Sequence, residues 1–119
     1  IIARIQQYQR RFVRLPLDME CQALFGHEED HTRATPISPG GTLVKTHRIV
    51  PVFSRADITL KDPAYGFEES VTGTVVYNTK GGSAVEFDNI IPYEKFRQLR
   101  EISLARHIRI VDTLKRSSL

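Results

Sequence analysis

The chain has a single cysteine, Cys21, among its 119 residues. One cysteine excludes an internal disulfide framework and any zinc site built from several cysteines, and it is compatible with a reducing compartment. No apolar run approaches the ~18 residues that a membrane-spanning helix requires. No secretory signal peptide, internal repeat or low-complexity tract is visible. With 40% hydrophobic and 26% charged residues, the composition predicts one soluble globular domain.

Basic residues outnumber acidic residues only slightly, and the formal net charge is +3. Residues 1–14 carry four arginines and no acid, and residues 92–119 carry seven Lys or Arg against three acids. A protein that binds polynucleotides can have such basic ends, but here the aromatic residues are not interleaved with the basic ones. We therefore expect no nucleic-acid polymer as a partner. Because the chain begins at Ile1 rather than at Met, we expect it to be a piece of a longer protein.

Arrangements typical of catalysis are missing. Ser38 lacks the G-x-S-x-G elbow of a nucleophilic serine and an identifiable triad. Cys21 alternates into an apolar strand face, which favours packing over nucleophilic chemistry. We therefore predict a non-enzymatic domain without catalytic residues and without a cofactor.

One stretch, residues 27–31, matches the HExxH pattern in which two histidines on a helix bind zinc and the glutamate activates water. It follows Gly26 and precedes Pro36, between two predicted strands, so a long rigid helix is not expected there. We interpret it as a polar hairpin loop with surface histidines and predict no metal site. A zinc peptidase would instead require stoichiometric metal and the loss of activity in Glu28→Ala.

Short strands separated by turn residues fill the middle of the chain. Residues 18–25 have the period-2 alternation of a half-buried strand, with Met19, Cys21, Ala23 and Phe25 on one side. Further strands are predicted at residues 32–37, 42–46, 56–60, 70–77 and 83–87, and a hairpin turn at residues 78–82 joins the last two. Because no helical segments lie between them, six such strands predict an antiparallel barrel or sandwich.

A long amphipathic helix is predicted from Pro92 to about Arg116, because apolar residues recur there at steps of three or four and no further Gly or Pro interrupts them. Its first turns could cover the mouth of a barrel. A helix of about seven turns exceeds what a barrel of this size needs, so the remainder is available for another helix or domain. Its hydrophobic stripe permits a homodimer. Residues 1–10 also have helical spacing.

Two separate pieces of the chain together suggest a ligand. Arginines one helical turn apart are followed, after 21 intervening residues, by a segment that begins at Pro36 and contains a Ser-x-x-Gly turn. A guanidinium matches phosphate oxygens or the O6/N7 edge of guanine, and glycines let the backbone approach a ligand. Each piece alone could instead be a solvated basic arm or an ordinary turn. The residues predicted to bind the ligand are Arg10, Arg11, Arg14, Pro36, Ser38, Gly40 and Gly41.

The pair Arg10 and Arg14 resembles the RxxxR element of the bacterial PilZ family, and residues 38–41 resemble the SxxG part of its (D/N)xSxxG element. The resemblance covers roughly residues 9–96, and it includes segments 72–77 and 82–87, which are similar to the closing hairpin of the family. It implies a mainly β fold: a six-stranded antiparallel PilZ-like barrel with an N-terminal arginine arm and a long C-terminal helix. Residues 1–8 would then be a linker or short helix, 9–91 the barrel, and 92–119 the helix.

The function that this resemblance implies is a receptor for cyclic di-GMP, in which the arm folds over the ligand and the arginines hold phosphates and guanine edges. Pro36 stands where the family has Asp or Asn, and its side chain cannot accept or donate a hydrogen bond. Losing such a contact typically costs ~1–3 kcal/mol, about ten- to a hundredfold in affinity. The alternative is a PilZ-like protein-interaction module that does not bind the nucleotide. The expected partners are cyclic di-GMP and a protein partner or neighbouring domain, in the bacterial cytoplasm, with this chain as the cytoplasmic portion of a larger protein.

Overall fold

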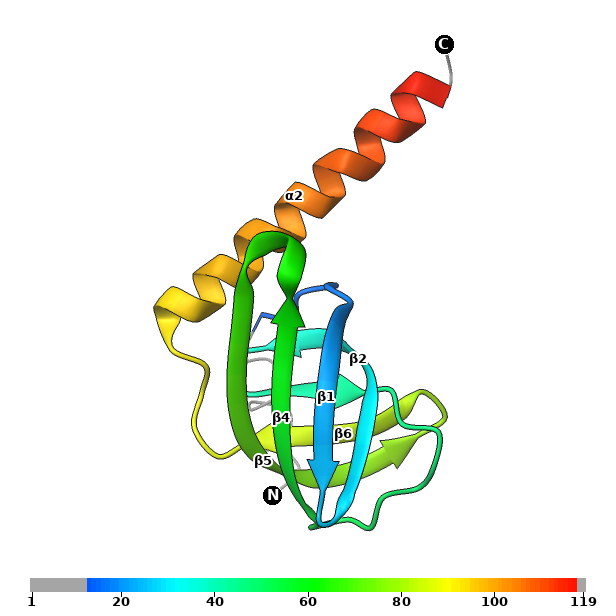
Figure 1. The fold of residues 1–119 in the computed structure, drawn as a ribbon, viewed down its shortest axis with the longest axis vertical. Helices are drawn as coiled ribbons and strands as arrows, with labels where there is room; N and C mark the ends of the chain where they lie inside the picture. Colours follow the sequence, from blue (N-terminus) through cyan, green and yellow to red (C-terminus); the bar gives the residue numbers. More distant parts are fainter. Residues whose placement is uncertain (1–12, 118–119) are drawn as a thin grey trace.

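Six antiparallel strands close into a barrel, and one long helix follows them (Figure 1). The structure, a computed structural model, describes the backbone of residues 13–117 and the side chains of residues 13–108. Around the barrel the strands follow the order β1-β2-β3-β6-β5-β4. The elements are β1 Met19–Phe25, β2 Glu28–Ser38, β3 Gly41–Val44, β4 Arg55–Asp62, the 3-10 turn η1 Pro63–Tyr65, β5 Phe67–Thr79, β6 Gly82–Phe87 and α2 Tyr93–Ser117. This architecture confirms the predicted mainly β fold with a C-terminal helix.

Alternating burial builds the interior of the barrel. Every second residue of β1, from Met19 to Phe25, is buried, as the alternation in the sequence predicts. Cys21 is 1% exposed, and burial raises the pKa of its thiol to about 12. A thiol with such a pKa stays neutral near pH 7 and is a weak nucleophile. The interpretation of Cys21 as a core residue is confirmed.

The second strand is longer than predicted, and this corrects the interpretation of residues 27–31 as a hairpin loop. Only the turn around His27 is outside the ladder, because Glu28 already pairs with the last residue of β1. The sequence does not reveal the strand pattern of this part of β2, because its half-buried side chains are polar like the exposed ones. Asp30 forms an ion pair with Arg48 at 3.2 Å, and the hydroxyl of Thr32 donates to the carbonyl of Lys45 at 2.6 Å.

The remaining strand predictions are correct in place and differ in length. β4 and β5 each extend beyond the predicted residues 56–60 and 70–77, whereas β3 ends at Val44 rather than at residue 46. The hairpin predicted at residues 78–82 is present, since Thr79 pairs with Gly82 and β5 continues into β6. Residues 45–54 instead form a long connection between β3 and β4.

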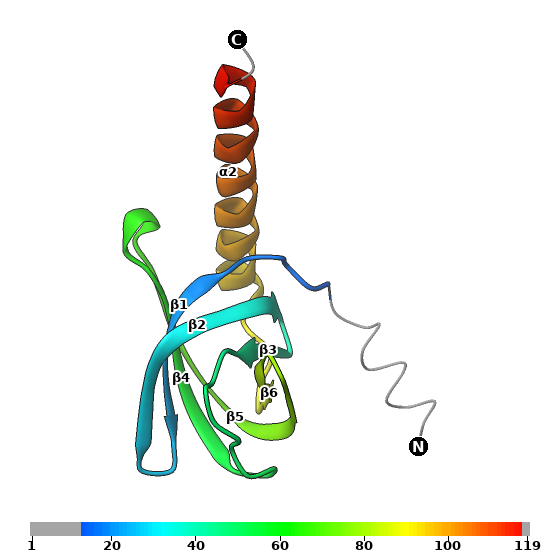
Figure 2. The ribbon, with the colours of Figure 1, turned by 90° about the vertical axis from the view of Figure 1, so that its right-hand side faces the viewer.

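The first half of α2 packs against one end of the barrel, and the second half extends away from it (Figures 1 and 2). Phe96, Leu99 and Ile102 are buried in the same core cluster as residues inside the barrel. Their spacing of three residues puts them on one face of the helix. Leu104 and Ile108, in contrast, are 61% and 51% exposed. The prediction that the first turns of the helix cover the barrel is confirmed.

Arg106 joins α2 to the barrel at the far end of this contact. Its guanidinium forms an ion pair with the carboxylate of Asp62, which is 2% exposed, and donates to the backbone carbonyl of Asp18 at 2.8 Å. Asp18 lies between residue 14 and the start of β1, and its carboxylate forms ion pairs with Arg33 and with Lys45. One arginine thus connects the helix, the end of β4 and the segment that enters the barrel.

Candidate functional site

The segment before β1 lies beside the end of β2. Leu15 and Ile37 form an antiparallel bridge in which each backbone N–H donates to the other's carbonyl, at 2.7 and 3.1 Å. In an antiparallel pair, the residue before one partner lies next to the residue after the other. The bridge therefore brings Arg14, which is exposed, alongside Ser38. Two motifs that are far apart in the sequence meet at this point of the barrel.

The other two arginines of the predicted site, Arg10 and Arg11, lie outside the described residues. The site that the structure describes therefore consists of Arg14, the turn at residues 38–41 and the strands next to that turn.

Ser38 closes this turn. Its hydroxyl donates to the carbonyl of Gly41 at 3.1 Å. The turn is also fixed from outside, because the carbonyls of Pro39 and Gly40 accept hydrogen bonds from the backbone of Ile91 and Phe87 at 2.8 and 2.9 Å. A hydroxyl that donates once still has acceptor capacity. Ser38 can thus hold the turn and accept a hydrogen bond from a ligand or a guanidinium at the same time.

Pro36 presents an exposed ring where the sequence comparison with the PilZ pattern calls for Asp or Asn. Its carbonyl accepts a hydrogen bond from the hydroxyl of Thr42 at 2.9 Å. The position offers an apolar surface and no polar side chain to a ligand.

Gly41 is required by the close approach of β3 and β6. A Cβ atom at this position would lie 2.5 Å from the carbonyl oxygen of Val85. In the same ladder Gly41 is the partner of Glu86. The missing side chain therefore serves the fold, and it means that no side chain stands between Ser38 and Glu86 in this row.

Strand register extends the site around the outside of the barrel. Ser38 pairs with Gly41, Gly41 with Glu86, Glu86 with Thr74, and Thr74 with Arg55. We call these five residues the outer belt: Ser38, Gly41, Glu86, Thr74 and Arg55. Directly paired residues project to the same face of a sheet. The sequence analysis missed the last three, because only the register of four strands reveals that they share a row with the turn.

An ion pair fixes the end of the outer belt opposite Arg14. The guanidinium of Arg55 donates to the carboxylate of Asp88 and to the hydroxyl of Thr74, at 2.9 Å each, and Thr72 donates to the same carboxylate at 2.8 Å. The hydrogen bonds from Arg55 and then from Thr72 lower the pKa of Asp88 to about 2. Arg14 thus lies at one end and the Arg55–Asp88 ion pair at the other end of a row that contains the acid Glu86.

We expect the carboxyl group of Asp88 to titrate near pH 2 when it is followed by NMR of the side-chain carbons. Its folded-state pKa lies below the ordinary value of 3.8. The Arg55–Asp88 pair should therefore contribute stability above about pH 4, and this contribution should be lost as the pH falls toward 2. In Arg55→Ala the pKa should rise toward the ordinary value. In the control Arg48→Ala, whose partners are Glu28 and Asp30, it should stay low. A wild-type pKa near 4 would contradict this assignment.

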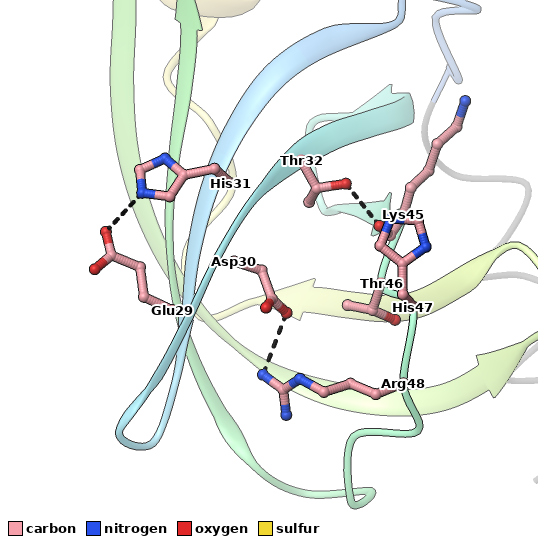
Figure 3. A pocket seen from close by; sticks show the side chains of 8 residues that line it. All are labelled: Glu29, Asp30, His31, Thr32, Lys45, Thr46, His47 and Arg48. Atoms are coloured by element: carbon pink, nitrogen blue, oxygen red, sulfur yellow. Dashed lines mark hydrogen bonds and ion pairs between the residues drawn. The ribbon is translucent and has the colours of Figure 1, made fainter.

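A separate shallow hollow of about 200 Å³ lies between β2 and the segment after β3 (Figure 3). His31 and Glu29 lie on one side of β2, and Asp30 points to the other side, toward Arg48 (Figure 3). The HExxH residues occupy a turn and a strand rather than successive turns of a helix. Within residues 13–108, no three His, Cys, Asp or Glu side chains gather to hold a metal ion.

Comparisons with known proteins identify the fold. No family model and no curated protein matches the chain. Among solved structures, the chain is similar to the Bacillus subtilis inhibitor of motility MotI/DgrA, a PilZ-domain protein, at 17% identity and a TM-score of 0.56. The match covers 84% of this chain and 52% of the other, so the chain spans about half the length of that protein. The fold is therefore PilZ-like. In the part of the chain that the structure describes, no helix has the length and apolar character to cross a membrane.

Proposed function

We propose that this chain is a PilZ domain that binds cyclic di-GMP through its arginine arm and passes the change on to a partner or a neighbouring domain. The observation that carries the proposal is the bridge between Leu15 and Ile37, which brings Arg14 to the Ser38 turn. The PilZ-like barrel adds support, because the Ser38 turn ends β2 and the segment before β1 bridges the end of that same strand.

The chemistry of these residues suits a phosphorylated guanine ligand. Arg14, with Arg10 and Arg11 before it in the sequence, supplies planar donor forks that match phosphate oxygens and the guanine O6/N7 edge. Ser38 retains acceptor capacity, and the exposed ring of Pro36 offers apolar contact to a base. Since Pro36 removes one polar contact, we expect binding weaker by about ten- to a hundredfold than with an Asp or Asn at this position.

A conformational change caused by ligand binding would reach α2 through the segment between the arm and β1. A ligand shifts a conformational equilibrium only through its different affinities for two arrangements. The arm ends at Arg14, and four residues later the carbonyl of Asp18 accepts a hydrogen bond from Arg106 of α2. Ordering of the arm over the ligand would therefore act on a segment that α2 contacts directly.

A protein partner or a second copy of the chain has an available surface on α2. Leu104 and Ile108 are both more than half exposed and are four residues apart, so they lie on the same face of the helix. This face also favours the second candidate function, a protein-interaction module that does not bind the nucleotide. We place the domain in the bacterial cytoplasm, where cyclic di-GMP acts, and we propose no catalytic role.

Isothermal titration with cyclic di-GMP tests the proposal. The wild-type domain should bind saturably, and the stoichiometry should distinguish one ligand from a stacked pair. Arg14→Ala and Arg10→Ala should each weaken binding by about a hundredfold or more, because each removes charge-assisted bidentate contacts.

His27→Ala is the control, because His27 lies in the β1–β2 turn, and its titration should match that of the wild type. GMP and GTP should compete poorly. If the folded wild-type domain releases no heat and a second binding assay also detects no complex, the interaction-module function takes its place.

A further inference from the structure

The turn lacks one group that recognition of guanine needs. The Watson–Crick edge of guanine carries hydrogen-bond donors at N1 and N2, and a carboxylate accepts both. Pro36 has no side-chain acceptor, and its carbonyl already accepts one hydrogen bond, from Thr42. A carboxylate for the guanine donors would therefore come from elsewhere on the outer belt.

Glu86 occupies the position from which such an acceptor can reach the turn. It is exposed and is the register partner of Gly41 on one side and of Thr74 on the other. Adjacent strands lie ~4.8 Å apart, so Glu86 is about 10 Å from Ser38, with only a glycine between them. Because no side chain stands between them, a base that lay over Gly41 would have one edge toward Ser38 and the other toward Glu86.

The second acid near the outer belt cannot serve in the same way. Asp88 accepts hydrogen bonds from Arg55 and Thr72, and these contacts occupy both of its carboxylate oxygens. Within residues 13–108, no side chain forms an ion pair with Glu86. Among the described residues, Glu86 is thus the one of these two acids whose carboxylate has no partner of its own.

We propose that Glu86 determines specificity by accepting hydrogen bonds from N1–H and the N2 amino group of a guanine that lies over Gly41. This inference rests on the proposed function. It also fixes the orientation of the ligand, because a carboxylate repels phosphate. The phosphates would lie toward Arg14 and the guanine edge toward β6.

The test compares the affinities of the full chain for cyclic di-GMP and cyclic di-AMP in wild type, Glu86→Gln and Glu86→Ala. Adenine has an acceptor at N1 and lacks the N2 amino group, so the wild-type domain should prefer the guanine ligand. Both variants should bind cyclic di-GMP about ten- to a hundredfold more weakly and lose much of this preference. Glu68→Gln, which changes an exposed glutamate of β5 outside the outer belt, should bind like the wild type. Because Glu86 is exposed, thermal unfolding should show that the variants remain folded.

The outcomes separate the two proposals. Unchanged or tighter binding of cyclic di-GMP by both Glu86 variants would overturn the role of Glu86 and leave the receptor function intact. Tighter binding in particular would mean that the carboxylate only repels the phosphates. If the wild-type domain binds neither dinucleotide, the receptor function fails, and the role of Glu86 fails with it.

Discussion

Replacing Arg106 with methionine should destabilise the folded domain by about 3–5 kcal/mol, because it leaves a buried carboxylate without its counter-charge. Asp62 is 2% exposed, and Arg106 is its ion-pair partner. The same substitution removes the hydrogen bond to the carbonyl of Asp18. Methionine keeps much of the length of the side chain, so packing against Tyr65 changes less than it would with alanine. Urea denaturation of the wild type and the variant measures the difference.

Two further variants show whether the buried charge is the cause. Arg97→Met changes an arginine on the same helix whose ion pair with Glu94 is largely exposed, and such a pair contributes about 0–1 kcal/mol. The double variant Asp62→Leu/Arg106→Met removes both charges and should recover much of the lost stability. If Arg97→Met and Arg106→Met destabilise equally, Arg106 is an ordinary surface residue and the connection between α2 and the barrel is weaker than described.

Gly41→Ala should also destabilise the fold strongly, by about 3 kcal/mol, at the upper end of the cost of overpacking. The added Cβ would lie 2.5 Å from the carbonyl oxygen of Val85. This atom belongs to the backbone of β6 and cannot move away without disturbing the ladder. The midpoint of thermal unfolding should fall by about 10–20 °C, which differential scanning fluorimetry can detect.

Gly81→Ala is the matched control, because a Cβ there would meet its nearest neighbours at an ordinary 3.6 Å. Its effect on stability should be within about 1 kcal/mol. This pair of variants matters for the interpretation of binding data. If Gly41→Ala loses cyclic di-GMP binding together with stability, the loss reports on the strands and not on a contact to the ligand. A Gly41→Ala variant as stable as the wild type would refute the close approach of β3 and β6.

Periodicity was sufficient to predict most of the fold. The alternation in residues 18–25 and the three- to four-residue spacing after Pro92 follow directly from which faces of β1 and α2 are buried. Residues 28–31 of β2 escaped prediction, because the half-buried side chain among them, Asp30, is polar and forms an ion pair with Arg48. When the residues on both faces of a strand are polar, the hydrophobic pattern that predicts a strand is absent from the sequence.

The candidate site was predictable only in part. Arg14 and the turn at residues 38–41 could be recognised as motifs, and the structure explains how they meet through the bridge at Leu15. Glu86 and Arg55 could not be found in this way, because their relation to the turn depends on the register of strands that are far apart in the sequence. Likewise, nothing local to Arg106 indicates that it reaches Asp62.

Because α2 continues well beyond its contact with the barrel at Arg106, a small tilt of the helix there would displace its C-terminal end by a larger distance. The helix continues from Arg106 to Ser117, about 16 Å at 1.5 Å per residue, and Figure 1 shows this part extending beyond the barrel. A tilt of about 10° at Arg106 would displace the far end of that segment by about 3 Å, given this helix length. A rearrangement at Asp18 too small to alter the barrel would thus become a displacement comparable to the size of a side chain.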